Sequence, residues 1–293
     1  SPRRIYSPLP HLAARRPTLA RDSQAAPNGQ PQKLRALANP ADRGQVRPMT
    51  RKPAWVVDKE RKARAAARET VWLFGLHAVR DALANPRRDK LRLILTRNAA
   101  DRLGDVPGQG GPEPEIADPR KFPAPLDPGS VHQGAALEVR PLDWGRLEDV
   151  ADPAGAPRLV LLDRVTDPHN AGAILRSAEV FGARAVIAPA RHSAPETGAL
   201  AKAASGALER QPYLRPTNLA AAMETLRGLG YLLAGLDGAG ETALPELAAE
   251  AASRPLGLVL GAEGAGMRAR TSELCDRRVR IPAAAGFGSL NVS

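Results

Sequence analysis

Apolar runs alternate with amphipathic segments in the second half of the chain, from residue 158 onward. An unbroken apolar run favours a strand that is buried on both faces, whereas apolar residues spaced three and four apart favour a helix. The pattern predicts strands at residues 158–165, 183–190, 231–237, 256–263 and 277–283, and helices at residues 170–182, 219–230 and around 268–275. Because helices separate the strands, we expect an α/β fold in which helices cover both faces of a parallel sheet.

A smaller α/β unit is predicted before this domain. Residues 71–85 begin as an apolar strand and continue as an amphipathic helix whose apolar face carries Ala78, Val79, Ala82 and Leu83. The rest of the pattern predicts strands at 91–97 and 131–139, a stretch at 98–130 that Pro, Gly and Asp interrupt too often for long helices, and a linker at 141–157.

The N-terminal segment has no sustained apolar periodicity and carries the positive charge of the chain. Residues 1–68 hold 16 Lys and Arg against four Asp and Glu, whereas the remaining residues hold 26 against 27. A basic segment of this kind is expected to stay disordered until it meets a polyanion, for which RNA is the natural candidate. A solubilising extension without a specific partner and an organellar transit peptide are the alternatives. The expected division of the chain is therefore a basic disordered extension at 1–69, a small α/β domain at 70–140, the linker at 141–157 and the main domain at 158–293.

Composition narrows the cellular setting and the kinds of site. Cys275 is the one cysteine among 293 residues, which excludes a disulfide framework and argues against a cysteine-based zinc site. His132 and His169 are isolated in sequence, so we expect no metal. No apolar run approaches the roughly 20 residues that span a bilayer. A reducing, cytoplasmic protein without a membrane partner is expected.

Three segments are the candidates for a binding site: residues 167–183, where a small polar turn comes directly before a helix, and the glycine-rich stretches at 256–267 and 281–293. Glycine adds little packing and costs chain entropy, so a run of glycines is typical of a turn or of a close approach between backbone and ligand. The sequence GAEGAG at 261–266 does not have the spacing of a dinucleotide-binding loop, and no strand with an acidic end follows about 20 residues later. We therefore expect the three segments to form a single site of another type.

These segments resemble, in order and spacing, the three motifs of the SpoU branch of the SPOUT RNA methyltransferases. The matching residues are Asn170 and Arg176 in the first segment, Gly261 and Glu263 in the second, and Ser289 and Asn291 in the third. The resemblance extends from about residue 71 to the end of the chain. It implies a C-terminal trefoil knot, a homodimer, S-adenosylmethionine as cofactor, and methylation of a ribose 2′-hydroxyl in structured RNA. Residues 70–140 would be a substrate RNA-binding domain that resembles a ribosomal protein fold.

The resemblance also implies roles for individual residues. Arg176 would hold a phosphate and the developing alkoxide, because a guanidinium does not give up its proton in proteins and is a poor base. Asn170, Ser289 or water would then guide the proton, Glu263 would fix backbone amides or Arg176, and Asn291 would organise the third motif. The cofactor's adenine and ribose would contact Gly261, Ile281 and Leu290.

Other interpretations stay open from the sequence alone. Taken singly, Arg176 suits an exposed helix position, Glu263 a helix N-terminus and Asn291 a helix cap. The substrate could be tRNA instead of the preferred rRNA, or the chain could be a non-catalytic RNA-binding or ribosome-assembly protein that keeps the fold. Ala283 stands where the family usually has a larger apolar residue, and we expect the intact protein to continue beyond Ser293 into a further helix.

Overall fold

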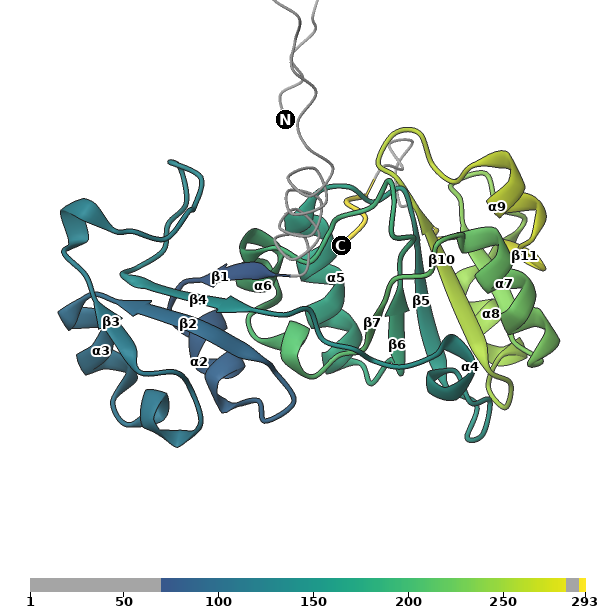
Figure 1. Cartoon of the computed structure of the whole chain (residues 1–293). Helices are drawn as coiled ribbons and strands as arrows, with labels where there is room; N and C mark the ends of the chain where they lie inside the picture. The colour runs from purple at the N-terminus through teal and green to yellow at the C-terminus, as the bar shows by residue number, and fades with distance from the viewer. Residues whose placement is uncertain (1–69, 283–289) are drawn as a thin grey trace, which may run out of the picture. The chain divides into compact units, whose positions relative to one another are not determined.

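A computed structural model of the chain describes residues 70–282 and 290–293. These residues belong to one compact unit and form two sheets, one of four strands and one of seven (Figure 1). The basic extension predicted for residues 1–69 lies outside the described residues.

The four-stranded sheet is built from the segment predicted as the small α/β unit. Its strand order is β1 (Val71–Phe74), β4 (Ala135–Val139), β2 (Lys90–Leu95) and β3 (Pro114–Ile116). Strand β4 runs antiparallel to both of its neighbours, whereas β3 runs parallel to β2. The helical segments are α2 (Leu76–Ala84), α3 (Arg97–Leu103) and two 3₁₀ turns at Val106–Gln109 and Pro119–Lys121. Helix α2 buries all four residues of its predicted apolar face.

Two local features of this unit differ from the predicted pattern. The strand expected at 131–139 begins only at Ala135, because Gln133 and Gly134 both have positive φ, 54° and 77°, and form a turn. The strand expected at 91–97 ends at Leu95, because helix α3 begins at Arg97 and continues into the stretch expected to contain no long helix. The helix is seven residues long and begins at a cap, where the Thr96 hydroxyl accepts a hydrogen bond from the Ala99 amide at 3.3 Å.

The seven-stranded sheet is parallel throughout, as predicted. Its order is β7 (Tyr213–Leu214), β6 (Ala185–Ile187), β5 (Arg158–Asp163), β10 (Leu256–Gly261), β8 (Leu232–Leu236), β11 (Arg277–Arg280) and β9 (Thr242–Ala243). The five longer strands lie within the segments predicted to be strands. Strands β7 and β9 have only two residues each, too few to give a periodic signal.

Helices cover both faces of this sheet. Successive strand residues point to opposite faces, so each strand contributes apolar side chains to both. On one face, Leu162 and Val186 pack in a cluster with α5 (Pro168–Val180) and α6 (Gly198–Ala204). On the other face, Leu161 and Ile187 pack in a cluster with α7 (Leu219–Gly228). The remaining helical segments are α4 (Leu147–Val150), α8 (Leu244–Glu250), α9 (Ala269–Glu273) and a 3₁₀ turn at Ala207–Glu209.

The segment predicted as a linker contributes to the core of the larger sheet. Helix α4 lies within residues 141–157, and Trp144, Leu147 and Val150 pack against the cluster that contains α7. Ala151 is fully buried.

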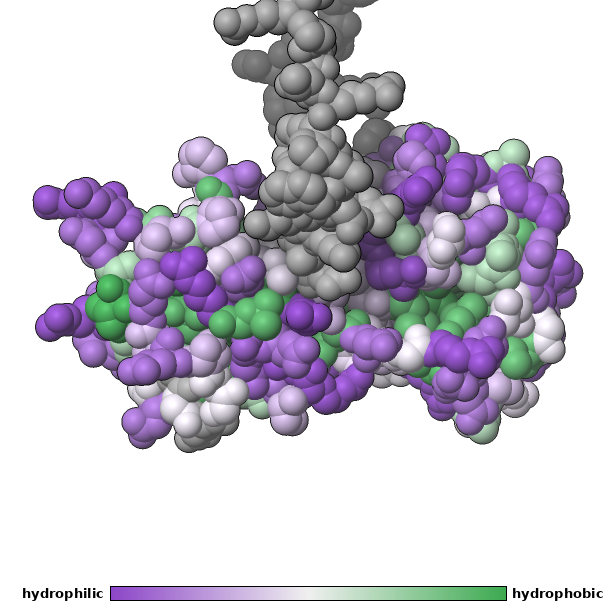
Figure 2. Space-filling model, viewed as in Figure 1, coloured by the Kyte–Doolittle hydropathy of each residue, from purple (hydrophilic) through white to green (hydrophobic). Residues whose placement is uncertain are grey.

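On the face of the molecule shown in Figure 2, hydrophilic side chains predominate and hydrophobic ones form smaller separate patches.

A buried ion-pair network joins the two sheets. The Arg88 side chain, which is fully buried and follows α2, contacts Glu196 at 2.6 Å and Glu209 at 2.7 Å. Asn85 also donates to the Glu209 carboxylate, at 2.9 Å. Gly198 packs so closely against Phe74 that a Cβ atom there would lie 2.3 Å from the ring.

Candidate active site

Polar and glycine residues gather where strands of the seven-stranded sheet end. In a parallel sheet the carboxyl ends of all strands meet at one edge, and ligands bind there, where the strand order changes direction. In this sheet the chain runs outward through β5, β6 and β7, and β10 lies on the other side of β5. Gly261 at the end of β10 pairs with Asp163 at the end of β5. Both residues therefore stand at the expected position of a ligand.

A cavity of about 1050 Å³ lies at this edge, beside the ends of β8, β10 and β11. It is lined by five of the residues predicted for the site, namely Gly261, Glu263, Ile281, Leu290 and Asn291. Leu236, Leu260, Met267 and Val292 add apolar surface, and the residues of the loop at 262–266 present mostly backbone. The structure thus brings the second and third candidate segments together around one cavity.

The loop after β10 is a tight turn that requires glycine. The Ala262 amide donates to the Gly266 carbonyl at 3.1 Å and the Gly266 amide donates to the Ala262 carbonyl at 2.8 Å. Gly264 and Gly266 have positive φ, 73° and 65°. At Gly261 a Cβ atom would lie 2.3 Å from the carbonyl carbon of Gly266. The sequence therefore folds the chain back on itself and leaves backbone groups exposed at the cavity.

Glu263 connects all three candidate segments. Its Oε1 atom accepts a hydrogen bond from Asn170 Nδ2 at 3.0 Å and lies 3.4 Å from the Val292 amide, which also donates to it. Asn170 lies in the first turn of α5, which is capped by Asp167 through a 2.9 Å hydrogen bond from the His169 amide. A single carboxylate thus holds the start of α5 and the end of the chain against the turn after β10.

Asn291 organises the chain end locally. Its Oδ1 atom accepts hydrogen bonds from both the amide and the hydroxyl of Ser293, each at 2.8 Å. Leu290 and Ile281 are 69% and 47% exposed, so apolar surface at the cavity remains open to a ligand. Ser289, the other residue predicted in the third segment, lies outside the described residues.

Arg176 is exposed on α5, six residues after Asn170. Within residues 70–282 and 290–293 it has no ion pair or hydrogen-bond partner for its side chain. Glu263 contacts Asn170 and a backbone amide, and does not contact Arg176. No side chain of the described residues therefore occupies the guanidinium, which is exposed to a ligand that approaches α5.

Sequence reasoning missed two residues that build this edge of the sheet. Asp163 is fully buried, and its carboxylate accepts hydrogen bonds from the amide and the Nε atom of Arg268, both at 2.8 Å. This ion pair fixes the chain where it leaves the glycine-rich turn and enters α9. An aspartate that ends a buried apolar run was the available signal, because an unpaired carboxylate there would be costly.

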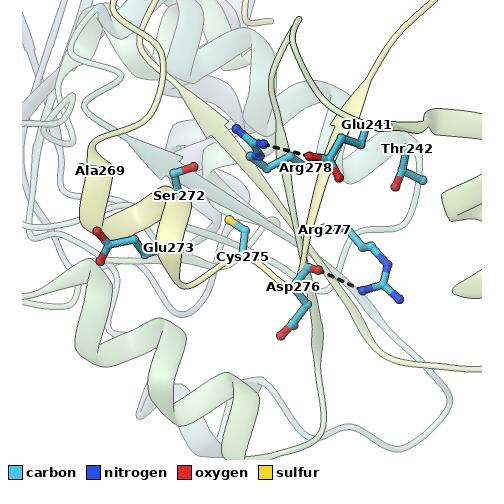
Figure 3. Close-up of a pocket in the computed structure, with 9 residues that line it drawn as sticks. All are labelled: Glu241, Thr242, Ala269, Ser272, Glu273, Cys275, Asp276, Arg277 and Arg278. Carbon is cyan, nitrogen blue, oxygen red and sulfur yellow. Dashed lines mark hydrogen bonds and ion pairs between the residues drawn. The ribbon is translucent and has the colours of Figure 1, made fainter.

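A second cavity, of about 720 Å³, lies beside β9, β11 and α9 (Figure 3). Glu241 and Arg278 point toward one another there and form a 3.1 Å ion pair. Burial raises the pKa of the Cys275 thiol in its wall to about 11, and Asp276 and Asp163 add to this effect. None of the seven predicted site residues that the structure describes lines it.

Among the residues that the structure describes, no group of three or more His, Cys, Asp or Glu side chains is arranged to hold a metal ion. No helix within the same residues has the length and apolar character needed to cross a membrane.

The sequence is similar to those of known RNA methyltransferases. Residues 157–293 match the SpoU rRNA Methylase family. The 23S rRNA (guanosine-2′-O-)-methyltransferase RlmB of Vibrio vulnificus is 38% identical over 230 residues, which cover 76% of this chain and 91% of the relative. An uncharacterized tRNA/rRNA methyltransferase of Synechocystis is 42% identical over 166 residues, and the chain spans only 42% of that longer relative.

A solved structure has the same fold. The SpoU methyltransferase AviRb from Streptomyces viridochromogenes, in complex with the cofactor AdoMet, matches with a TM-score of 0.65 over 80% of this chain and 88% of that chain. The sequence identity of 23% supports a likeness of fold alone.

Proposed function

Because this chain belongs to the SpoU rRNA methylase family, we propose that it transfers the methyl group of S-adenosylmethionine to a ribose 2′-hydroxyl in ribosomal RNA. The observation that carries the proposal is the position of Glu263, which hydrogen-bonds to Asn170 and to the Val292 amide beside a cavity lined by the predicted cofactor residues. Its relative RlmB is named for methylation of a guanosine 2′-oxygen in 23S rRNA.

The cavity suits a nucleoside with a charged tail. Its volume lies slightly above the usual range of small-molecule sites, and its walls combine apolar side chains with a few polar groups, as such sites do. Leu236, Ile281 and Leu290 offer apolar contacts to an adenine ring. The turn at 262–266 offers backbone amides and carbonyls that could hydrogen-bond the ring edge and the ribose. Gly261 keeps this wall close, because any side chain there would collide with Gly266.

When bound, S-adenosylmethionine supplies an electrophilic methyl group together with its leaving group. The protein must then hold the acceptor oxygen in line with that methyl, and good alignment can contribute roughly 7–11 kcal/mol. Arg176 would bind the phosphate next to the acceptor ribose and stabilise the negative charge that develops on the 2′-oxygen. Asn170, held by Glu263, would orient the hydroxyl, and Ser289 or water would receive its proton. Asn291 would keep the third motif in place.

Several broader features are part of the same proposal. Residues 158–293 would form the catalytic domain with a C-terminal trefoil knot, in keeping with the chain end returning to Glu263 beside β10. Residues 70–140 would be the substrate RNA-binding domain and residues 1–69 a basic extension that contacts RNA. The enzyme would be a cytoplasmic homodimer, and the exposed Val180 and Phe181 at the end of α5 offer apolar surface for a second copy. Light scattering of the purified protein measures its molar mass in solution and so distinguishes a dimer from a monomer.

Methyl transfer from tritium-labelled S-adenosylmethionine to unmodified 23S rRNA transcript tests the activity. We expect incorporation that maps, by resistance to alkaline cleavage, to one ribose 2′-oxygen, and we expect incorporation to be slower by about 100-fold or more with the Arg176→Ala variant. Incorporation into unmodified tRNA in place of rRNA would favour the tRNA alternative. Cofactor binding without transfer to either RNA would favour a non-catalytic RNA-binding protein.

A further inference from the structure

Two loops at the carboxyl edge of the large sheet present basic side chains next to the cavity. The first loop is residues 164–167, between β5 and α5, and the second is residues 188–197, between β6 and α6. We infer that Arg164, Arg191 and His192 on these loops form a site for the backbone phosphates of the RNA strand that carries the acceptor ribose. This inference rests on the proposed function and assigns residues outside the three motifs.

The two loops are neighbours and lie close to the cofactor cavity. Strands β5 and β6 pair with each other, and the Ala194 amide of the second loop donates to the Val165 carbonyl of the first at 2.9 Å. Arg164 directly follows Asp163, the residue that pairs with Gly261 in the cavity wall. The first loop continues into α5, which carries Asn170 and Arg176. A strand whose ribose reaches Asn170 therefore passes beside these loops.

Hydrogen bonds on the inner side hold the second loop in one shape. Arg215 donates to the Ala190 carbonyl at 3.0 Å and also to the Ala194 carbonyl, which accepts a second hydrogen bond from the Tyr213 hydroxyl at 2.8 Å. The buried Ser193 hydroxyl donates to the Pro189 carbonyl. At the far end of the loop Glu196 is paired with Arg88. With its inner side fixed in this way, the loop turns Arg191 and His192 outward, where both are exposed.

Backbone strain marks one residue of each loop. Arg164 has a φ of 63° and His192 a φ of 62°, in the left-handed region that L-residues with long side chains rarely adopt. Such strain persists only where the surroundings over-determine it, and it is concentrated at ligand sites. Here the constraint comes from two buried residues, Val165, which follows Arg164, and Ala194, which lies two residues after His192.

No described residue neutralises the positive charge of the site. Within the described residues neither Arg164 nor Arg191 forms an ion pair. The nearby carboxylates are already engaged, since Asp163 binds Arg268, Glu196 binds Arg88 and Asp167 caps α5. Phosphate is the matching ligand, because arginine binds it through a planar pair of donors and the acceptor ribose carries a phosphate on either side.

The test measures binding of the full chain to unmodified 23S rRNA transcript over a range of salt concentrations. The variants are Arg164→Gln, Arg191→Gln, His192→Gln and the triple combination. Arg254→Gln is the matched control, because Arg254 is an exposed arginine that precedes β10, at the opposite edge of the sheet. Each phosphate contact contributes about 0.7–0.9 to the slope of log affinity against log salt. The triple variant should therefore lower the slope by about two to three, and Arg191→Lys should leave it unchanged.

Calorimetry with S-adenosylmethionine and thermal unfolding accompany every variant. Unchanged cofactor affinity and unfolding temperature, together with the reduced slope, would support the inference. A triple variant with the slope of the wild type or of Arg254→Gln would overturn it, and so would a loss of cofactor binding or of stability that accounts for the weaker RNA binding. Absence of methyl transfer by the wild-type chain would refute the proposed function, whereas the slope would still test the phosphate site.

Discussion

Two carboxylates in the candidate site each hold more than one donor. Glu263 accepts from a side-chain amide of α5 and from the backbone near the chain end, and Asp163 accepts twice from Arg268. Hydrogen bonds to an ionised acceptor are stronger than neutral ones, so each carboxylate can fix loops that have little packing of their own. Arg176 differs from both, because it has no such partner within the described residues.

Replacement of Arg176 should therefore affect catalysis far more than cofactor binding. Loss of a donor that stabilises developing negative charge costs on the order of 100-fold or more in turnover, so Arg176→Ala should lose about that much. Arg176→Lys should also fail, because lysine lacks the planar pair of donors. Steady-state kinetics and cofactor calorimetry on both variants provide the measurement. A lysine variant with near-wild-type turnover would contradict the assigned role.

The thiol of Cys275 should react slowly with disulfide reagents in the folded protein. Its pKa is raised to about 11 by burial, compared with 9.0 for an ordinary cysteine, and its sulfur donates a hydrogen bond to the Thr271 carbonyl. Because the thiolate is the reactive form, the reactive fraction at pH 8 is about 100-fold lower than for an ordinary thiol. Labelling with a chromogenic disulfide in the native state should be slower by at least that factor than labelling in urea. Equal rates would show that the thiol is not buried.

At the element scale, the glycine-rich turn after β10 forms one wall of the proposed cofactor cavity. Gly261→Ala should lower S-adenosylmethionine affinity at least tenfold, because its methyl group would overlap backbone atoms of Gly266 and Met267. Overpacking of this kind costs about 1–3 kcal/mol. Gly228→Ala is the matched control, since no atom lies within 4 Å of a Cβ placed at this helical position. Calorimetry should find normal cofactor affinity for the control, and an equal loss in both variants would argue against a steric cause.

The elements differ in how well the sequence predicts them. Strands β5 and β10 were predicted because each is a continuous apolar run, and α7 because its buried residues repeat at helical spacing. Helices α6 and α8 were not predicted. The sequence of α6, GALAKAA, contains little more than small residues, and α6 packs closely against Gly172 of α5, where a Cβ would lie 2.5 Å from Ala203. Contacts of this kind depend on the tertiary structure.

The same limit applies to the site. The glycine-rich segments could be found from composition, and five of the eight predicted residues line one cavity. The partner of Glu263 could not be derived, because Asn170 lies 93 positions away in the chain. The loops that carry Arg164 and His192 gave no signal either, since positive φ at a non-glycine residue follows from the packing around it.

At the scale of the whole molecule, the buried network around Arg88 joins the segment at 70–140 to the segment at 158–293. Arg88 donates to Glu196, to Glu209 and to the Arg140 carbonyl. Burial raises the pKa of the Glu196 carboxyl, although the charge of Arg88 acts in the opposite direction. Arg88 is thus the residue that pairs directly with both acidic side chains in this buried network.

Removal of that arginine should therefore destabilise the whole chain. Arg88→Ala would leave the buried Glu209 and the largely buried Glu196 without the arginine that pairs with both, and breaking a buried ion pair in this way costs about 3–5 kcal/mol. Arg92→Ala is the control, because Arg92 makes an equally short 2.7 Å contact with Glu115 but both side chains are nearly half exposed, and an exposed pair contributes at most about 1 kcal/mol. Urea denaturation followed by circular dichroism measures both changes. If both variants lowered the free energy of unfolding by the same amount, the buried network would not stabilise the contact between the two segments.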